Sequence, residues 1–451
     1  MKREFDSEFY KTLVKIALPI ALQGLISSSL TLLDNLMVSK LGELSLTAVG
    51  LAIQSFNIHW MMIFGFCSGC STFYTQFWGI KDMKNIRKVI GIALTTCFTL
   101  SLLFFIAGFS FPVGVLNLLT NSPEAAVLGA EYLKIAAINF ILIGITQPFM
   151  AALRATQQTK IPMYISIASF FTDVIFNYLL IFGKFGFPMM GVRGAALATV
   201  MARALELILA VYFVFVRKNL IAGKIKEFFS FNWKYVKRVY SNALATTCNE
   251  VMWSSAVVAE NAAYGHMTVT AYAAIQASAT IMDLFQMACF SIGDASMILI
   301  GERLGRNEIE EARTISKKLL RTALVFGAGV AGVLCPINRP IISLFTLTEL
   351  GVFYARRLII FRALNIPINL QNGIMISGTF RAGGDAKFAA ITEISLMLLV
   401  AVPICFLGAL ILKLPVYWVY LMTMSEGFIK LIILRKRYNS GKWLKNMISG
   451  M

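Results

Sequence analysis

The feature that most constrains this chain is a series of apolar runs, each long enough to cross a lipid bilayer. A helix rises about 1.5 Å per residue, so about 20 apolar residues span the hydrocarbon core. Transmembrane β-strands need only about 10 alternating residues, so runs of this length exclude a transmembrane β-barrel. We predict an all-α integral membrane protein with twelve transmembrane helices. The runs lie near residues 13–38, 48–78, 89–110, 126–152, 162–182, 192–216, 236–263, 271–300, 319–338, 352–379, 388–412 and 416–434.

The formal net charge of +18 is distributed unevenly between the loops. If the N-terminus is cytoplasmic, the cytoplasmic segments hold 30 of the 41 Lys and Arg residues. Such an excess on the cytoplasmic side is the positive-inside rule, so the charge indicates topology and not a nucleic-acid partner. We therefore expect a multi-pass protein of the cell membrane, surrounded by lipid, with both termini in the cytoplasm.

The two halves of the sequence resemble each other. RATQQTK at residues 154–160 matches RAGGDAK at 381–387, and QFWGIKDMKNIRK at 76–88 matches ERLGRNEIEEART at 302–314. Six runs separate the equivalent segments, so both halves have the same orientation in the membrane. We predict two pseudo-symmetric six-helix lobes that can rock about a central cavity. The expected divisions are an N-lobe at 1–216, a cytoplasmic linker at 217–235, and a C-lobe with a basic cytoplasmic tail at 236–451.

Ionisable and polar residues interrupt several runs of the first half. Asp34 lies in the first run, and Gln23 shares its helical face. Asp173 and Asn177 are one turn apart in the fifth run, and Thr199 in the sixth lies at a similar depth to Asp34 and Asn177. Intramembrane acids usually face a protein interior or an aqueous cavity. We predict that Asp34, Asp173, Asn177 and Thr199 bind the coupling ion, which is either a proton or Na⁺ held by the first three.

The second half offers fewer well-supported candidates. Glu250 lies near the middle of the seventh run, with Asn261 on the same face, and Asp283 lies in the eighth run. We expect these three residues and Gln23 to contact the substrate or a second cation. The alternative for each intramembrane acid is a structural role, in which a neutral or hydrogen-bonded carboxyl group holds helices together.

Several motifs together resemble the multidrug and toxic compound extrusion (MATE) family over essentially the whole chain. They are LDNLMVSKLGELSLTAVG, LRATQQTKIPM, NYLLIFGKFGFPMMGVRGAALAT and FRAGGDAK. The resemblance implies a two-lobe antiporter that exports cationic or amphipathic organic compounds in exchange for Na⁺ or H⁺.

The resemblance also implies roles for individual residues. Asp34 matches the family's acid on helix 1, Thr199 matches the threonine of the GAALAT motif, and Glu250 matches a helix 7 glutamate. The family has an asparagine followed by an aspartate on helix 5, whereas Asp173 precedes Asn177 here. The helix 10 aspartate that accompanies the helix 7 glutamate has no counterpart, which weakens the expectation of a cation site in the C-lobe.

Two other functions remain as alternatives. A flippase for lipid-linked sugars shares the two-lobe plan, but it predicts a cavity rich in Arg and Lys. A polytopic membrane enzyme would need clustered His, Asp or Glu at a membrane face, whereas His59 and His266 stand alone. The sequence also lacks the G-x-x-x-x-G-K-[ST] phosphate-binding loop. We expect no catalytic residues and no cofactor beyond the coupling ion, small organic cations as partners, and a monomer.

Overall fold

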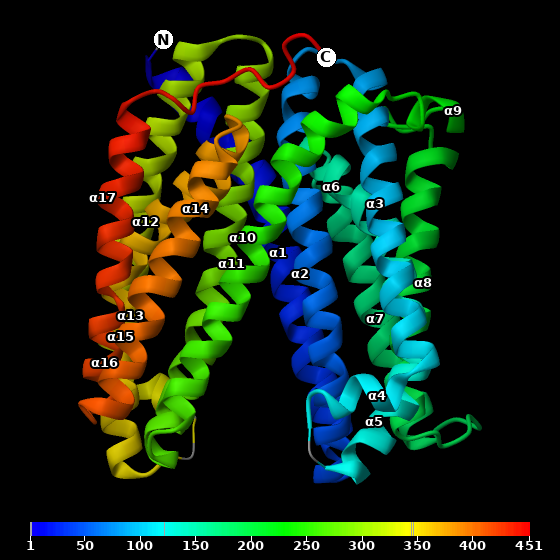
Figure 1. The fold of residues 1–451 in the computed structure, drawn as a ribbon, viewed down its shortest axis with the longest axis vertical. Helices are drawn as coiled ribbons and strands as arrows, with labels where there is room; N and C mark the ends of the chain where they lie inside the picture. Colours follow the sequence, from blue (N-terminus) through cyan, green and yellow to red (C-terminus); the bar gives the residue numbers. More distant parts are fainter. Residues whose placement is uncertain (1, 121, 344, 346) are drawn as a thin grey trace. The chain divides into compact units, whose positions relative to one another are not determined.

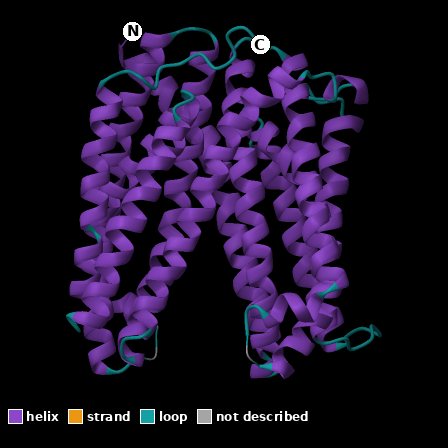
Figure 2. Ribbon diagram, in the orientation of Figure 1, coloured by secondary structure: helices purple, strands orange, loops and turns teal. Residues whose placement is uncertain are grey.

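The computed structural model describes residues 2–120, 122–343, 345 and 347–451. Helices joined by short loops make up this part of the chain, and no strand occurs in it (Figure 2). Each of the twelve predicted apolar runs is helical, which confirms the all-α membrane fold. Among the described residues, nine helices are long and apolar enough to cross a membrane, and the two bent halves of α11 make a tenth.

The helices of the first half follow the six predicted runs, and the fourth run is divided in two at Ala137. Figure 1 shows them in blue to green. They are α1 (Lys2–Ser39), α2 (Glu43–Gly79), α3 (Met83–Ser110), α4 (Pro112–Asn117), α5 (Pro123–Ala136), α6 (Ile138–Ala155), α7 (Lys160–Phe182), α8 (Val192–Val211) with its π-helical extension η1 (Tyr212–Val216), and the short α9 (Ile225–Phe228).

The second half repeats this plan, with several π-helical turns inside its helices. The helices α10 and α13 carry many polar residues and fall outside the nine apolar spans. The elements are α10 (Trp233–Gly265), α11 (Val269–Gly305), α12 (Ile309–Ile342), α13 (Glu349–Gly373), η2 (Ile374–Phe380), α14 (Ala386–Leu396), η3 (Met397–Ala401), α15 (Val402–Phe406), η4 (Leu407–Ile411), α16 (Val416–Thr423) and α17 (Ser425–Asn439).

The chain divides into two compact units whose borders fall inside helices. What we call the N-terminal unit comprises Pro19–Tyr74 and Lys81–Ala243, and the C-terminal unit comprises Met1–Leu18, Thr75–Ile80 and Leu244–Met451. The borders within α1 and α10 occupy equivalent places in the sequence repeat. The lobe divisions expected from the sequence, at 216 and 235, do not allow for these crossings and stay a prediction.

The end of α2 belongs to the C-terminal unit because small residues let it approach α11 closely. Gly301 and Gly305 are four residues apart on α11, in the small-xxx-small spacing typical of tight helix crossings in membranes. A methyl group at Gly305 would lie 1.9 Å from the Gln76 carbonyl oxygen, and one at Gly301 would lie 2.1 Å from the Thr75 hydroxyl. Only glycine permits this contact.

The C-terminal residues after α17 form a tail that lies against the same end of the C-terminal unit. The Gln76 side chain donates to the carbonyls of Ala382 at 2.8 Å and Lys445 at 3.1 Å, and it accepts from the Met447 backbone N–H at 2.6 Å. Trp443 is buried and stacks on Tyr438. The start of α1 and the end of α17 lie at this end too (Figure 1).

An ion-pair cluster on Asp385 joins this tail to the loop before α14. The Asp385 carboxylate accepts from Arg437 Nε at 2.7 Å and from Lys445 Nζ at 3.1 Å. Burial alone would raise the pKa of Asp385, but hydrogen bonds from the two cations outweigh burial and hold the pKa below its ordinary value. Asp385 is therefore ionised at neutral pH.

In the N-terminal unit, loops that the sequence assigns to the cytoplasm likewise meet at one end. Arg87 pairs with Glu227 at 2.6 Å, and the Gln158 side chain donates to Asn219 at 3.1 Å. The Tyr235 hydroxyl donates to the Asn85 carbonyl at 3.2 Å. Segments 81–88, 154–160 and 217–235 therefore share one end of the unit, as the positive-inside pattern requires.

Candidate functional site

The site is built on one polar face of α7. Ser166, Ser169, Asp173 and Asn177 recur at helical spacing, and all four are buried. The remaining positions are mainly apolar, so the helix turns its polar face into the protein, away from lipid. The face predicted from the sequence is confirmed.

Small residues allow α8 to lie close to this face. A methyl group at Gly194 would lie 2.6 Å from the Leu180 carbonyl oxygen, so the helices α7 and α8 approach too closely for any side chain there. Further along, Ser169 donates to the Ala202 carbonyl at 3.2 Å. This close packing brings Thr199, on α8, into reach of α7.

Asp34, Asp173 and Asn177 form one cluster. The Asn177 side-chain amide donates to Asp34 Oδ1 and to Asp173 Oδ2, each at 2.8 Å. The Asn177 amide thus bridges the two carboxyl groups, which are close enough to interact electrostatically. Two ionised carboxylates repel at such a distance, so the pair requires a shared proton or a cation. The structure thus brings together acids that are 139 positions apart in the sequence.

Two oxygen atoms of this cluster have acceptor capacity to spare. Asp173 Oδ1 and Asn177 Oδ1 are buried and have no hydrogen-bond partner among the described residues. The Thr199 hydroxyl donates to the Ala195 carbonyl of its own helix at 3.1 Å, and it lies near Asp173 and near the hydroxyl of Tyr132 on α5. Buried oxygen atoms without donors favour a small cation. Sequence reasoning missed Tyr132, since a tyrosine within an apolar run gives no signal of its position.

A neighbouring ion pair on α8 leaves the net charge of the cluster unchanged. Arg203 Nη1 donates to Glu206 Oε2 at 2.8 Å, and Glu206 is buried. Arg203 also interacts electrostatically with Asp34 and Asp173. The pair is neutral in itself, so the Asp34–Asp173 cluster retains the charge that must be balanced by an ion.

Gln23, the fifth candidate of this half, lies deeper along the same two helices. Its side-chain amide donates to the Ser166 hydroxyl at 3.1 Å, joining α1 to α7. Gln23 is not among the residues that contact Asp34, and its place next to the polar face is consistent with the predicted solute contact, which stays a prediction.

In the C-terminal unit, the predicted residues do not assemble in the same way. The Glu250 carboxylate is 2.5 Å from Arg381 Nη2, and both side chains are nearly buried. Asn261 is half-buried, eleven residues further along α10, and Asp283 on α11 is exposed within its unit. Arg381 neutralises Glu250, so this glutamate on α10 has a fixed internal counter-ion. A role of these three residues in cation or solute binding stays a prediction.

The structure reveals a second charged cluster that the sequence did not predict. Lys430 on α17 pairs with Glu393 on α14 at 3.2 Å and with Glu426 on its own helix at 2.8 Å. Asn249, adjacent to Glu250, donates to Glu393 at 2.9 Å. The i,i+4 spacing of Glu426 and Lys430 was the only available signal, and it is equally typical of a solvent-exposed helix face.

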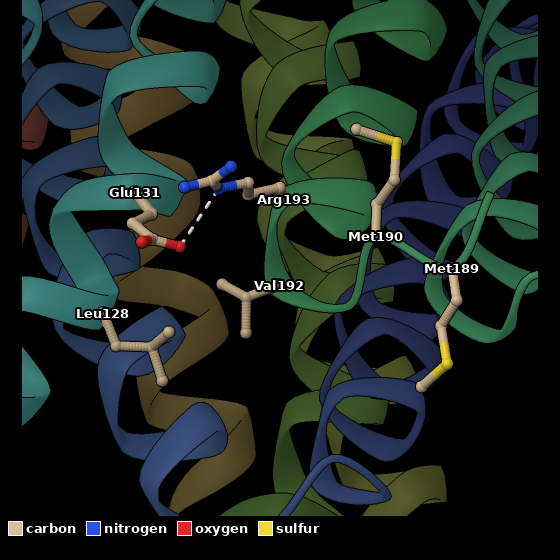
Figure 3. Close-up of a pocket in the computed structure, with 6 residues that line it drawn as sticks. All are labelled: Leu128, Glu131, Met189, Met190, Val192 and Arg193. Carbon is tan, nitrogen blue, oxygen red and sulfur yellow. Dashed lines mark hydrogen bonds and ion pairs between the residues drawn. The ribbon is translucent and has the colours of Figure 1, made fainter.

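A cavity of about 380 Å³ lies at the far end of the N-terminal unit, beside α5 and the start of α8. Figure 3 shows Glu131 and Arg193 paired across it, at 3.1 Å. None of the predicted site residues lines this cavity. No group of three or more His, Cys, Asp or Glu side chains in the described part of the chain is arranged to hold a metal ion. The full lining is Leu128, Glu131, Met189, Met190, Val192 and Arg193.

Comparison with known proteins agrees with this architecture. The MatE family model matches the chain twice, over residues 19–179 and 244–407. The two matches begin at the residues where the compact units begin in α1 and α10. They confirm the internal repeat.

Similar proteins match over most of their length. The chain is 24% identical to the uncharacterized transporter YisQ of Bacillus subtilis, over 99% of this chain and 97% of the relative. It is 24% identical to the probable multidrug resistance protein NorM of Thermotoga maritima, over 77% of this chain and 74% of the relative. A crystal structure of MATE in the bent conformation superposes with a TM-score of 0.87 at 18% identity, over 96% of each chain. The chain therefore belongs to the MATE family of membrane transporters.

Proposed function

We propose that this protein is a secondary active antiporter that exports cationic or amphipathic organic compounds in exchange for Na⁺ or H⁺. The observation that carries the proposal is the cluster of Asp34, Asp173 and Asn177, in which one amide group bridges two carboxyl groups inside a transmembrane bundle. Membership of the MATE family supports the same activity. The names of relatives such as the probable multidrug resistance protein NorM support multidrug efflux as its direction.

The cluster can bind either of the proposed coupling ions. A proton would be shared between the Asp34 and Asp173 carboxyl groups, while Na⁺ would take its oxygen ligands from Asp34, Asp173 and Asn177. Asn177 orients both carboxyl groups through one amide nitrogen, and Thr199 on α8 lies near Asp173. The buried position keeps competing water away and makes binding sensitive to the shape of the cluster.

Exchange follows if the ion and the solute stabilise different conformations of the transporter. The coupling is mutual, because an ion that disfavours the solute-bound state is itself disfavoured by the solute. Downhill entry of one positive charge supplies about 2.3 kcal/mol per 100 mV of membrane potential, in addition to any concentration gradient. This mechanism needs no nucleotide, no cofactor and no catalytic residue, and the protein acts as a transporter and not as an enzyme.

The charge of the site favours this proposal over a flippase for lipid-linked sugars. A phosphate head group requires a cavity dominated by Arg and Lys, whereas Arg203 beside the N-terminal cluster is paired with Glu206. We further propose that the protein is a monomer of the cell membrane with both termini in the cytoplasm. The gathering of basic segments at one end of each unit supports that orientation.

Efflux of a fluorescent organic cation from proteoliposomes tests the proposal under separately imposed Na⁺ and H⁺ gradients. Asp34→Asn removes one carboxylate and should reduce gradient-driven efflux by about 10- to 100-fold, within the usual range of coupling energies. Glu131→Gln is the matched control, since it neutralises an exposed acid of the same unit. Its efflux should stay within about twofold of wild type, as expected of an exposed ion pair.

Either of two results would contradict the proposal. Asp34→Asn transporting as fast as wild type under both gradients would remove the coupling role of this cluster. Efflux that depends on ATP and ignores both ion gradients would exclude antiport altogether.

A further inference from the structure

The buried charged cluster of the C-terminal unit has no role in the exchange described above. Lys430 Nζ lies 3.2 Å from Glu393 Oε1 and 2.8 Å from Glu426 Oε1, and the three side chains are only 9, 12 and 13% exposed. We call these three residues, with Asn249 and Asn365, the Lys430 cluster. The helices α14 and α17 that carry its charges lie side by side (Figure 1).

The cluster is one positive charge short of neutrality. Two carboxylates surround a single ammonium group, and burial of an unbalanced charge is costly. The nearby Glu260 and Arg362 are of opposite sign, so Arg362 is not a spare cation for the cluster. Glu250 and Arg381 likewise cancel. A structural ion pair would need only one of the two acids.

Two buried amide oxygens provide a second, independent observation. Asn249 donates its amide to Glu393, but its Oδ1 has no hydrogen-bond partner among the described residues. Asn365 on α13 also has a buried Oδ1 for which the described part of the chain provides no donor, and it faces Gly427, the neighbour of Glu426. Asn249 and Asn365 are 4% and 5% exposed. Acceptors of this kind can receive the N–H groups of a ligand.

We propose that the Lys430 cluster binds a primary or secondary organic ammonium ion, and that the Lys430 side chain is a tethered competitor that the ligand displaces. The proposal rests on the proposed function, because it names the site and chemical class of the exported cation. The ligand ammonium takes the place of Lys430 at Glu393, where Asn249 and Asn365 accept its remaining N–H groups.

The fold allows this exchange without leaving a charge unpaired. Lys430 and Glu426 are one turn apart on α17, so they remain partners when the Lys430 ammonium withdraws from Glu393. The four-carbon stem of lysine gives the ammonium the required freedom. With the ligand on Glu393, two carboxylates face two cations and the cluster is neutral. A dication would overshoot neutrality, so the site favours monocations.

Equilibrium binding to the purified full-length protein tests the proposal without any ion gradient. The probes are dansylcadaverine, which carries a primary ammonium group, and tetraphenylphosphonium, which carries no N–H. Lys430→Met removes the competitor and should lower the Kd of dansylcadaverine at least about tenfold, while Glu393→Gln should raise it about tenfold. The Kd of tetraphenylphosphonium should change by less than about threefold, since it cannot use the amide acceptors.

Two further variants keep the test decisive. Lys387→Met is the matched control, because it removes an exposed lysine from the same helix that carries Glu393, and the Kd values should stay within about twofold of wild type. Lys430→Met with Glu426→Gln preserves the net charge of the cluster, so it should fold even if the single variant does not. It should also bind dansylcadaverine more tightly than wild type.

The outcomes separate this inference from the proposed function. Wild-type protein that binds neither probe would contradict the export of organic cations itself. If folded Lys430→Met or the double variant binds dansylcadaverine no more tightly than wild type does, only the tethered-competitor role is overturned. The same is true if both probes respond equally, since the amide acceptors would then have no part in recognition.

Discussion

The two units of this transporter share one repeat but balance charge inside the membrane in opposite ways. In the N-terminal unit, Asp34 and Asp173 meet with only Asn177 between them, so the protein supplies no cation at the point of contact. In the C-terminal unit, Lys430 lies between Glu393 and Glu426. The first arrangement suits a small ion from solution. The second contains its own ammonium group, which a larger organic cation can replace.

Ligand chemistry in this repeat protein is therefore set by a few side chains and not by the shared helix plan. The MatE family model matches both halves, yet an amide stands at the centre of one cluster and an ammonium at the centre of the other. The two proposals together assign ion coupling to one unit and solute recognition to the other.

Neutralising one acid in each unit tests whether the two units have different roles, and it should give the largest effect. Asp173→Asn should abolish the response of efflux to ion gradients, a loss of about two orders of magnitude at the upper end of usual coupling energies. Glu393→Gln should keep the response of efflux to ion gradients and weaken the binding of the solute. Transport assays at several solute concentrations measure both. If Glu393→Gln removes the ion response and Asp173→Asn does not, the assignments are reversed.

Variants of the Glu250–Arg381 pair test whether Glu250 is available to ligands. Removing one partner of a buried ion pair leaves an uncompensated charge and costs about 3–5 kcal/mol. We therefore expect Arg381→Met to lower the unfolding temperature strongly in detergent. Adding Glu250→Gln to it should restore most of the loss. A single variant as stable as wild type would mean that Glu250 is free for the predicted cation role.

Asn177 tests whether the amide organises the N-terminal acids. Asn177→Ala removes two hydrogen bonds to carboxyl groups, each of which is worth about 1.5–3 kcal/mol. Efflux should fall about tenfold, less than for Asp173→Asn, because both carboxyl groups remain. Asn177→Asp, which adds a third acid at this point, should shift the pH dependence of efflux. Unchanged efflux in Asn177→Ala would show that the acids need no amide.

The smallest effect concerns Asp385, outside the membrane. The pKa of Asp385 is lower in the folded protein than its ordinary value. The ionised carboxylate therefore stabilises the fold fully at any pH above that ordinary pKa. The stabilisation is lost as pH falls through the lowered pKa. Asp385→Asn should therefore cost about 1 kcal/mol at neutral pH. The difference from wild type should begin to shrink below about pH 4 and should vanish only when the pH is below the lowered pKa of Asp385. Thermal unfolding across this pH range measures it. A difference that persists in acid would contradict an electrostatic origin.

The sequence predicted that Asp34, Asp173 and Asn177 lie together because regular helices carry these residues. Asp173 and Asn177 lie on one face of α7 at the expected spacing, and depth counted from the helix ends placed Asp34 at their level. The length of the apolar runs likewise predicted helices at all twelve positions. Period and rise per residue were sufficient wherever the backbone keeps the α-helical repeat.

Both quantities failed to predict the main charge contacts of the second half. Arg381 follows η2 and lies in the RAGGDAK segment between two apolar runs, so spacing within a run could not relate it to Glu250. Its contact with Glu250 was therefore hidden. Lys430 and Glu393 meet through the packing of α14 on α17, which no local pattern specifies. The border at Pro19 depends on contacts between distant segments, which the apolar runs do not encode.

The tail after α17 has a practical consequence. Gln76 relies on Lys445 and Met447 for two of its three hydrogen bonds, and Trp443 is almost completely covered. Removing the last dozen residues to attach a fluorescent reporter would therefore disturb the contact between α2 and α11. A reporter joined after Met451 through a flexible spacer leaves that contact intact.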